Sequence, residues 1–183
     1  LQIDASHAHL NMPATFVWAR GFVAAPVGLT VRPRDGWRVV TQLVPTRDST
    51  IFTAPNVTYF LDSPTEVGPV TIRSWQTTHA GRPSTWRLAV HHLGTEAQVD
   101  SFAVMAQRIV AEQIASWGEP PGLDFGVYTF IADYLPWVNG DAMEHRNSTF
   151  LTGRTPIAER TGRVTQLGSL SHELFHAWNG ERL

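Results

Sequence analysis

The distribution of apolar residues changes at Gly94-Thr95, and this change limits what the chain can fold into. Before it, segments rich in β-branched and aromatic residues alternate with Gly, Pro and Asp, which is typical of strands joined by turns. After it, Thr95 and Gln98 form a capping-box pattern and a helical apolar stripe begins. The sequence therefore predicts an α+β fold, with a β-rich domain over residues 1–93 and a second region over residues 94–183.

The first region contains four segments with the composition of strands. Their spacing, with turn residues between them, indicates a sandwich-like arrangement or an open curved sheet. The segments cover residues 15–19, 37–44, 70–77 and 85–90.

The second region is predicted to combine helices and strands. Its first helix begins after Thr95 and is closed by Gly118, because Pro120-Pro121 prevents its continuation. Strands are predicted over residues 125–131 and 144–151, and a final helix over residues 164–179.

The final predicted helix carries the motif with the clearest chemical meaning, His-Glu-Leu-Phe-His at residues 172–176. Residues four apart share a helix face, so His172 and His176 can hold one metal ion together. Glu173 lies about 100° round the helix from His172 and can serve as a general base without being a ligand. This is the arrangement of a zinc metallopeptidase.

An apolar stripe supports this interpretation of the helix. Leu167, Leu170, Leu174 and Trp178 are spaced by three or four residues, and the two histidines lie on the opposite side. One face is therefore predicted to pack into a core while the other faces a site. The alternative is an ordinary helix with two surface histidines and an acidic neighbour.

A second motif lies upstream, Gly-Asp-Ala-Met-Glu-His-Arg-Asn-Ser at residues 140–148. Together with His-Glu-Leu-Phe-His-Ala-Trp-Asn at residues 172–179, it resembles the glycyl aminopeptidase family of zinc metallopeptidases. Two earlier segments resemble the same family in the same order, Gly-Trp-Arg-Val-Val-Thr at 36–41 and Asp-Ser-Pro-Thr-Glu-Val-Gly at 62–68. The resemblance implies that residues 94–183 are the first part of a thermolysin-like catalytic domain, truncated in this chain.

The chain departs from the family pattern at two points. Asp141-Ala142 replaces the glycine before the Glu-His pair, and Met143-Glu144 is similar to the larger alanyl-type aminopeptidases. The residues after the second histidine, Trp178-Asn179, fit the glycyl family better.

The resemblance implies a role for each site residue. His172 and His176 would bind Zn²⁺, Glu173 would be the catalytic general base, and Glu144 with Met143 would bind substrate. Glu144 would hold the free α-amino group of a peptide, so the expected activity is release of N-terminal residues such as Gly or Ala. The alternative for Glu144 is an ordinary strand residue with a solvent-exposed carboxylate.

A catalytic zinc needs three protein ligands, and the family takes the third from a glutamate on a later helix. We therefore expect the third ligand beyond Leu183, which would leave this fragment incomplete and inactive. Glu181 lies just past the predicted helix end and is not favoured as a ligand. The alternative function is a non-catalytic peptide-binding or structural module with the same fold.

Composition excludes several partners. The net charge is −2 with scattered arginines, so no nucleic-acid partner is expected, and no apolar run approaches the ~20 residues of a membrane span. The chain has no cysteine, which excludes thiolate ligands. A peptide substrate is the expected partner, while oligomeric state and compartment, bacterial periplasm or cytoplasm, stay open.

The remaining histidines are weaker candidates for a site. His7 and His9 lie two apart and would share one face of an extended segment, where they could chelate a metal, but near the chain start they are expected to be solvated surface residues. His91 and His92 are adjacent, so in a strand they point to opposite faces and cannot bind one metal together.

Overall fold

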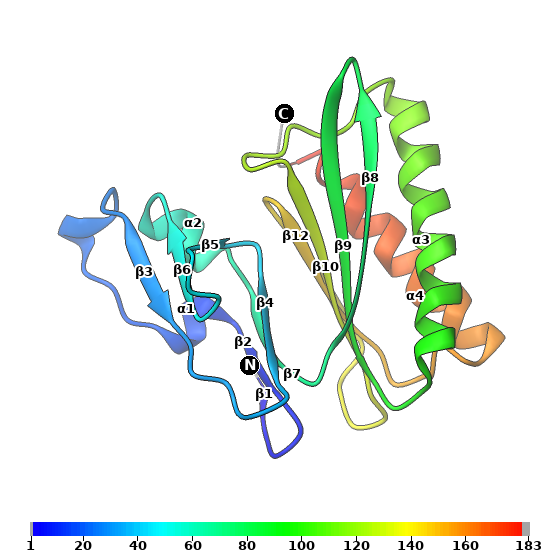
Figure 1. The fold of residues 1–183 in the computed structure, drawn as a ribbon, viewed down its shortest axis with the longest axis horizontal. Coiled ribbons are helices and arrows are strands. Elements are labelled where there is room, and N and C mark those ends of the chain that lie inside the picture. Colours follow the sequence, from blue (N-terminus) through cyan, green and yellow to red (C-terminus); the bar gives the residue numbers. More distant parts are fainter. Residues whose placement is uncertain (1, 181–183) are drawn as a thin grey trace. The chain divides into compact units, whose positions relative to one another are not determined.

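A computed structural model describes residues 2–180, and the chain divides into two compact units, residues 1–70 and 71–183 (Figure 1). The sequence pattern predicts a boundary at Gly94 instead. The difference arises because β8 (Thr71–His79) pairs along its length with β9 (Arg82–His92), and β9 pairs with β10 (Val127–Tyr134). The two strands before Gly94 are therefore part of the second unit. Glu181 lies outside the described residues.

The N-terminal unit contains two antiparallel sheets. The four-stranded sheet has the order β1 (Gln2–Ile3), β2 (Ala8–Leu10), β7 (Thr65–Gly68), β4 (Arg38–Thr41). The three-stranded sheet has the order β3 (Val27–Thr30), β6 (Ile51–Ala54), β5 (Val44–Pro45). The unit also has two short helices, α1 (Met12–Thr15) and α2 (Val57–Leu61), and a 3₁₀ turn, η1 (Arg20–Phe22).

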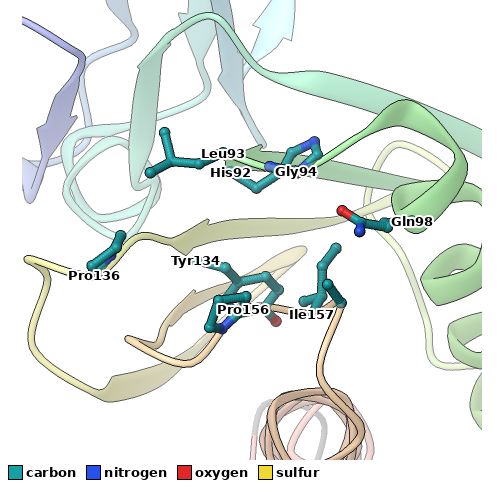
Figure 2. Close-up of a pocket in the computed structure, with 9 residues that line it drawn as sticks. His92, Leu93, Gly94, Gln98, Tyr134, Pro136, Pro156 and Ile157 are labelled. Atoms are coloured by element: carbon teal, nitrogen blue, oxygen red, sulfur yellow. The ribbon is translucent and has the colours of Figure 1, made fainter.

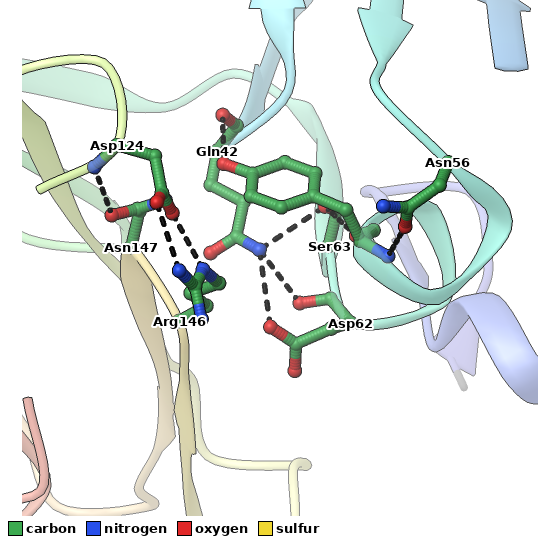
Figure 3. Close-up of polar contacts among 8 residues, drawn as sticks. Gln42, Asn56, Asp62, Ser63, Asp124, Arg146 and Asn147 are labelled. Atoms are coloured by element: carbon green, nitrogen blue, oxygen red, sulfur yellow. Dashed lines mark hydrogen bonds and ion pairs between the residues drawn. The ribbon is translucent and has the colours of Figure 1, made fainter. Parts of the chain in front are cut away.

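Both sheets and both helices of this unit contribute to one apolar core. Its buried members are Met12, Leu29, Leu43, Phe52, Ala54, Tyr59 and Phe60. The helix α2 is capped by Asn56, whose Oδ1 accepts a hydrogen bond from the Tyr59 backbone at 2.8 Å (Figure 3). Gln42, which directly follows β4, links that strand to the end of α2, because its Nε2 donates a hydrogen bond to the Asp62 carbonyl at 2.9 Å (Figure 3).

The predicted strand at residues 15–19 is wrong. Residues 12–15 form α1 and residues 16–19 have no regular structure. Asn11 caps this helix through its side chain, and Pro13 stands in the first turn, where a missing backbone N–H costs nothing. Of the β-forming residues that follow, Phe16 packs against Phe60 at 5.2 Å between ring centroids, whereas Val17 and Trp18 are exposed.

The C-terminal unit is built on a five-stranded sheet with the order β11 (Asp141–His145), β12 (Ser148–Thr152), β10, β9, β8. The strands β9, β10 and β12 are parallel, and the edge strands β11 and β8 are antiparallel to their neighbours. The predicted single strand over residues 144–151 is wrong. It is the hairpin β11–β12, with Arg146 and Asn147 in the turn.

Two helices cover one face of this sheet (Figure 1). They are α3 (Glu96–Trp117) and α4 (Arg160–Phe175). The covered face carries alternate residues of each strand, such as Leu88 and Val90 on β9, and Phe130 and Ala132 on β10, which join helix side chains in the core.

The helix α3 has the predicted ends. The side-chain oxygen of Gln98 accepts a hydrogen bond from the Thr95 backbone at 2.9 Å, and Gly118 closes the helix with a φ of 82°. The helix α4 begins earlier than predicted and its regular part ends at Phe175, with turns over residues 176–180. Among the described residues, no helix has the length and apolar character needed to cross a membrane.

Candidate active site

The two histidines of the predicted motif lie together at the C-terminal end of α4. Their Nε2 atoms are 3.3 Å apart, and their rings are 5.0 Å apart between centroids. His176 stands just after the last regular residue of α4 but keeps helical backbone angles, so the spacing of four residues still places both rings on one side. The opposite side of the helix is the buried stripe of Leu170, Leu174 and Trp178.

The orientation of His176 is set by its backbone neighbour. Its Nδ1 lies 3.2 Å from the carbonyl oxygen of Asn179. A carbonyl can only accept, so Nδ1 carries the proton in the neutral ring and Nε2 presents its lone pair toward His172. A histidine held in this way through its second nitrogen is typical of metal sites.

The end of α4 is held by α3 and the loop after it. Gln113 of α3 donates from Nε2 to the Ser171 carbonyl at 2.7 Å. Trp178 donates from Nε1 to the Glu119 carbonyl at 2.9 Å and stacks on Trp117 with ring centroids 6.1 Å apart. These contacts fix the backbone on both sides of the two histidines.

Glu173 lies between the histidine pair and the core. Its Oε1 is 3.9 Å from the Nε2 of His172, and the residue is only 6% exposed. Burial raises the pKa of the Glu173 carboxyl above its usual range, and the charges of Glu144 and Asp141 add to this while both histidines oppose it. A carboxylate with a raised pKa is a stronger proton acceptor when ionised.

Glu144 lies on β11, the edge strand that packs beside α4. Alternation along the strand places Glu144 on the same face as Ala142, which packs against the helix-covered core. The electrostatic effect of Glu144 on Glu173 agrees with this placement. Glu144 of β11 and the predicted site residues of α4 therefore lie on facing sides of one unit.

The side chain of Met143 points away from α4, on the face of β11 opposite to Glu144. Met143 precedes Glu144 on the strand, and it is 50% exposed. Its carbonyl accepts a hydrogen bond from the Thr149 hydroxyl at 2.9 Å. Any contact between substrate and the Met143 side chain would be on the face away from α4.

The turn between β11 and β12 is anchored by Asp124, a residue that sequence reasoning did not single out (Figure 3). Arg146 donates to both Asp124 carboxylate oxygens, from Nε at 2.6 Å and from a terminal nitrogen at 2.9 Å. Asn147 donates from Nδ2 to Asp124 at 2.7 Å and accepts from the Asp124 backbone at 3.2 Å. No local sequence pattern could have revealed this residue, since it lies 22 positions before Arg146.

The prediction that His7 and His9 are solvated is wrong. His7 is fully buried and His9 is 7% exposed. His9 lies on β2 opposite Glu66 of β7, with 3.6 Å between Nδ1 and the carboxylate, so strand pairing inside the unit encloses it. His91 lies 3.7 Å from Asp133, while His92 faces Thr71.

The fold is a mixed helix-and-sheet arrangement, and His172, Glu173 and His176 form a group whose ligand atoms lie close enough together to hold a metal ion. Residues 1–69 match the family model of the Peptidase M61 N-terminal domain. No curated protein matches the chain. The crystal structure of an aminopeptidase N family protein from Idiomarina loihiensis is similar in fold, with a TM-score of 0.76 and 22% sequence identity. That match covers 99% of this chain and 32% of the other, so the chain spans about a third of that protein's length.

Proposed function

We propose that this chain is part of a zinc-dependent aminopeptidase of the glycyl aminopeptidase type, in which α4 supplies two metal ligands and a general base. The observation that carries the proposal is the 3.3 Å separation of the His172 and His176 Nε2 atoms beside the buried Glu173. The match of residues 1–69 to a peptidase family and the aminopeptidase-like fold support it.

The two histidines fit a zinc ion. Zinc–nitrogen bonds of ~2.05 Å at a tetrahedral angle separate two ligand nitrogens by about 3.3 Å. The hydrogen bond from His176 Nδ1 to Asn179 leaves its Nε2 free to coordinate. When bound, zinc would supply Lewis acidity that polarises the peptide carbonyl and makes a water molecule more acidic.

The proton transfers would belong to Glu173. It would accept a proton from the water that attacks the scissile carbonyl, and then donate that proton to the leaving amine. The raised pKa of the Glu173 carboxyl suits both steps. A carboxylate with a higher pKa accepts a proton from water more readily, and the carboxyl can still give that proton to the leaving amine, which is the stronger base. Burial against the core limits the carboxylate to few orientations.

Glu144 would select peptides with a free N-terminus. Its carboxylate stands near Glu173 on the side of β11 that faces α4, where an α-ammonium could form a charge-assisted hydrogen bond. The open edge of β11 could also pair with the backbone of an extended peptide. Asp124 would act as a positioning residue, because it fixes the hairpin that carries Glu144.

The test compares the full-length protein with its Glu173→Gln and His172→Ala variants. Metal content per chain and hydrolysis of alanine and glycine p-nitroanilides are measured together. We expect one zinc per chain and activity in the wild type, zinc without activity in Glu173→Gln, and loss of both in His172→Ala. A folded wild-type protein that holds zinc without hydrolysing any free or blocked peptide would favour a non-catalytic module instead.

A further inference from the structure

The two candidate metal ligands lie in the part of α4 where a helix is least stable. His172 belongs to the last turn of the helix, and His176 follows its last regular residue, Phe175. The carbonyl groups of a final turn lack helical partners, so helix ends open more readily than helix centres. Any change in the twist of this turn would alter the 3.3 Å separation of the two Nε2 atoms. A metal site here therefore needs contacts from outside the helix to keep its geometry.

The other end of α4 does not supply such contacts. The segment that leads into the helix, with Pro156, Ile157 and Ala158, borders a pocket of about 230 Å³, so packing beside it is incomplete (Figure 2). A helix of 16 residues is about 24 Å long, which separates this end from the last turn. The geometry of the last turn therefore depends on contacts made close to it.

Two residues far away in the sequence provide hydrogen bonds at the last turn. Gln113 of α3 donates from Nε2 to the Ser171 carbonyl at 2.7 Å, and the same nitrogen lies 2.9 Å from the Ser171 hydroxyl oxygen. Beyond the two histidines, Trp178 donates to the Glu119 carbonyl at 2.9 Å. Trp178 also belongs to the apolar core, so a substitution there would change packing and hydrogen bonding together. Gln113 makes the contact that can be tested separately.

Gln113 holds the residue directly before His172. The side chain of His172 is 71% exposed, so packing does little to fix its ring. Its polar contacts join it to His176, at 3.3 Å, and to Glu173, at 3.9 Å, which belong to the same motif. The position of the His172 ring therefore follows from its backbone, and the hydrogen bond from Gln113 fixes that backbone one residue earlier, at Ser171.

The amide of Gln113 also lowers the stability of the fold. The Ser171 carbonyl can only accept a hydrogen bond, so the amide nitrogen faces it and Oε1 points the other way. This oxygen is buried and has no hydrogen-bond partner among the described residues. A buried acceptor without a partner destabilises the folded state, and an apolar side chain of the same shape avoids that loss. A polar residue that stability does not favour is typical of a residue that serves a site.

We infer that Gln113 is a positioning residue of the proposed metal site: it holds the last turn of α4 through Ser171 and thereby keeps His172 and His176 at the separation that one metal ion requires. This role rests on the proposed function, because zinc is the ion that the two histidines would hold. It requires that one substitution lowers zinc affinity without lowering stability. A residue that only stabilised the contact between α3 and α4 would lower stability when it is replaced.

The test compares the full-length wild type with its Gln113→Met variant. Methionine is unbranched, apolar and of similar length, so it fills the space without either amide group. Competition with a chelator measures zinc affinity, and urea unfolding of the zinc-free protein measures stability. We expect the urea midpoint to stay the same or to rise. Removal of an outer partner of a metal ligand typically lowers affinity about 10- to 100-fold, and we expect about tenfold, because Gln113 acts through the backbone.

Two further variants and one further measurement complete the test. Glu112→Met makes a similar replacement at the neighbouring, exposed position of α3, and it should change neither zinc affinity nor the urea midpoint. Gln113→Asn is one methylene shorter, so its amide is withdrawn from Ser171, and it gives the same comparison if Gln113→Met fails to fold. Hydrogen exchange of the zinc-free protein needs no metal, and the amides of residues 174–176 should exchange faster in Gln113→Met than in the wild type.

Three results would overturn the role of Gln113. They are an unchanged zinc affinity in Gln113→Met, unchanged hydrogen exchange in the last turn, or a lower urea midpoint, which would show that the residue only stabilises the fold. Failure of the proposed function is seen separately, in the wild type, as a folded full-length protein that binds no zinc. Equally tight zinc binding by the wild type and Gln113→Met would leave the proposed function intact and remove only the role of Gln113.

Discussion

His172 and His176 approach each other to 3.3 Å between their Nε2 atoms. In water, two histidines on a helix surface have no strong reason to meet, because a hydrogen bond between two neutral rings contributes little. The separation equals the distance that two ligands of one tetrahedral zinc ion require, about 3.3 Å. The separation of the two nitrogens therefore supports the proposed zinc site.

Zinc affinity should depend on both rings. In the full-length protein, His176→Ala should lower zinc affinity by more than about 100-fold. Removing a residue that only orients a metal ligand already costs about 10- to 100-fold in affinity, and removing a ligand itself should cost more. His79→Ala is a matched control, because this histidine lies at the exposed tip of the β8–β9 hairpin. Competition with a chelator measures the affinities, and an unchanged affinity in His176→Ala would remove this residue from the site.

The Glu173→Gln variant should separate chemistry from metal binding. Glutamine keeps the shape of the side chain but cannot accept a proton, so turnover should fall by ~10²–10⁴-fold while zinc content stays the same. The measurement is kcat on an amino-acid p-nitroanilide together with metal analysis. Near-normal turnover in a variant with full zinc would show that Glu173 is not the general base.

The role of Glu144 can be tested through the substrate. Glu144→Ala should lower kcat/KM for free peptides by at least about tenfold, the effect of one charge-assisted hydrogen bond, and should affect N-acetylated peptides much less. Glu112→Ala, an exposed carboxylate on α3, is the control and should behave as wild type. Equal losses on free and blocked peptides would mean that Glu144 shapes the site without recognising the amine.

Asp124 should stabilise the hairpin that carries Glu144. Asp124→Ala removes the acceptor of both Arg146 and the buried Asn147, so it should lower the free energy of unfolding by about 1–3 kcal/mol. Arg146→Ala should cost less, because its pair with Asp124 is partly exposed and the Asn147 contact remains. Urea unfolding measures both effects, and a larger loss from Arg146→Ala would contradict this order.

Acidic pH should destabilise the C-terminal unit through His92. Burial lowers the pKa of His92 below its ordinary value of 6.5, although the Glu96 charge opposes the shift. The unfolded chain then binds a proton that the folded chain resists, so stability is retained at pH 7 and declines as the pH falls below about 6.5. Protonation would also break the hydrogen bond that Nδ1 accepts from Gly94.

The His92→Gln variant isolates this contribution. Melting temperatures are compared at pH 7.5 and pH 5.5 for the wild type and the variant. The wild type should lose more stability on acidification than His92→Gln does. An identical pH dependence would show that other groups, such as the buried His7, account for the whole effect.

The two long helices of this chain, α3 and α4, could be predicted from the sequence because their determinants are local. The cap of α3 at Thr95 and its end at Gly118 depend on residues within one turn, and both stand where the pattern indicated. The same holds for α4, whose apolar stripe and histidine pair follow from the helical repeat alone. Only its exact ends differ from the prediction.

The tertiary structure alone decided how the strands are grouped. The composition of a strand shows that it can pair, but contacts with distant parts of the chain decide which strand it pairs with. For example, β9 pairs with β10, although α3 separates the two strands in the sequence. The hairpin within residues 141–152 depends on Asp124, and the burial of His9 depends on Glu66. The hydrogen bonds of a helix join residues four apart, whereas those of a sheet join segments that are distant in the sequence. The sequence by itself therefore determined the histidine motif on α4. Only the tertiary structure brought β11 beside that helix.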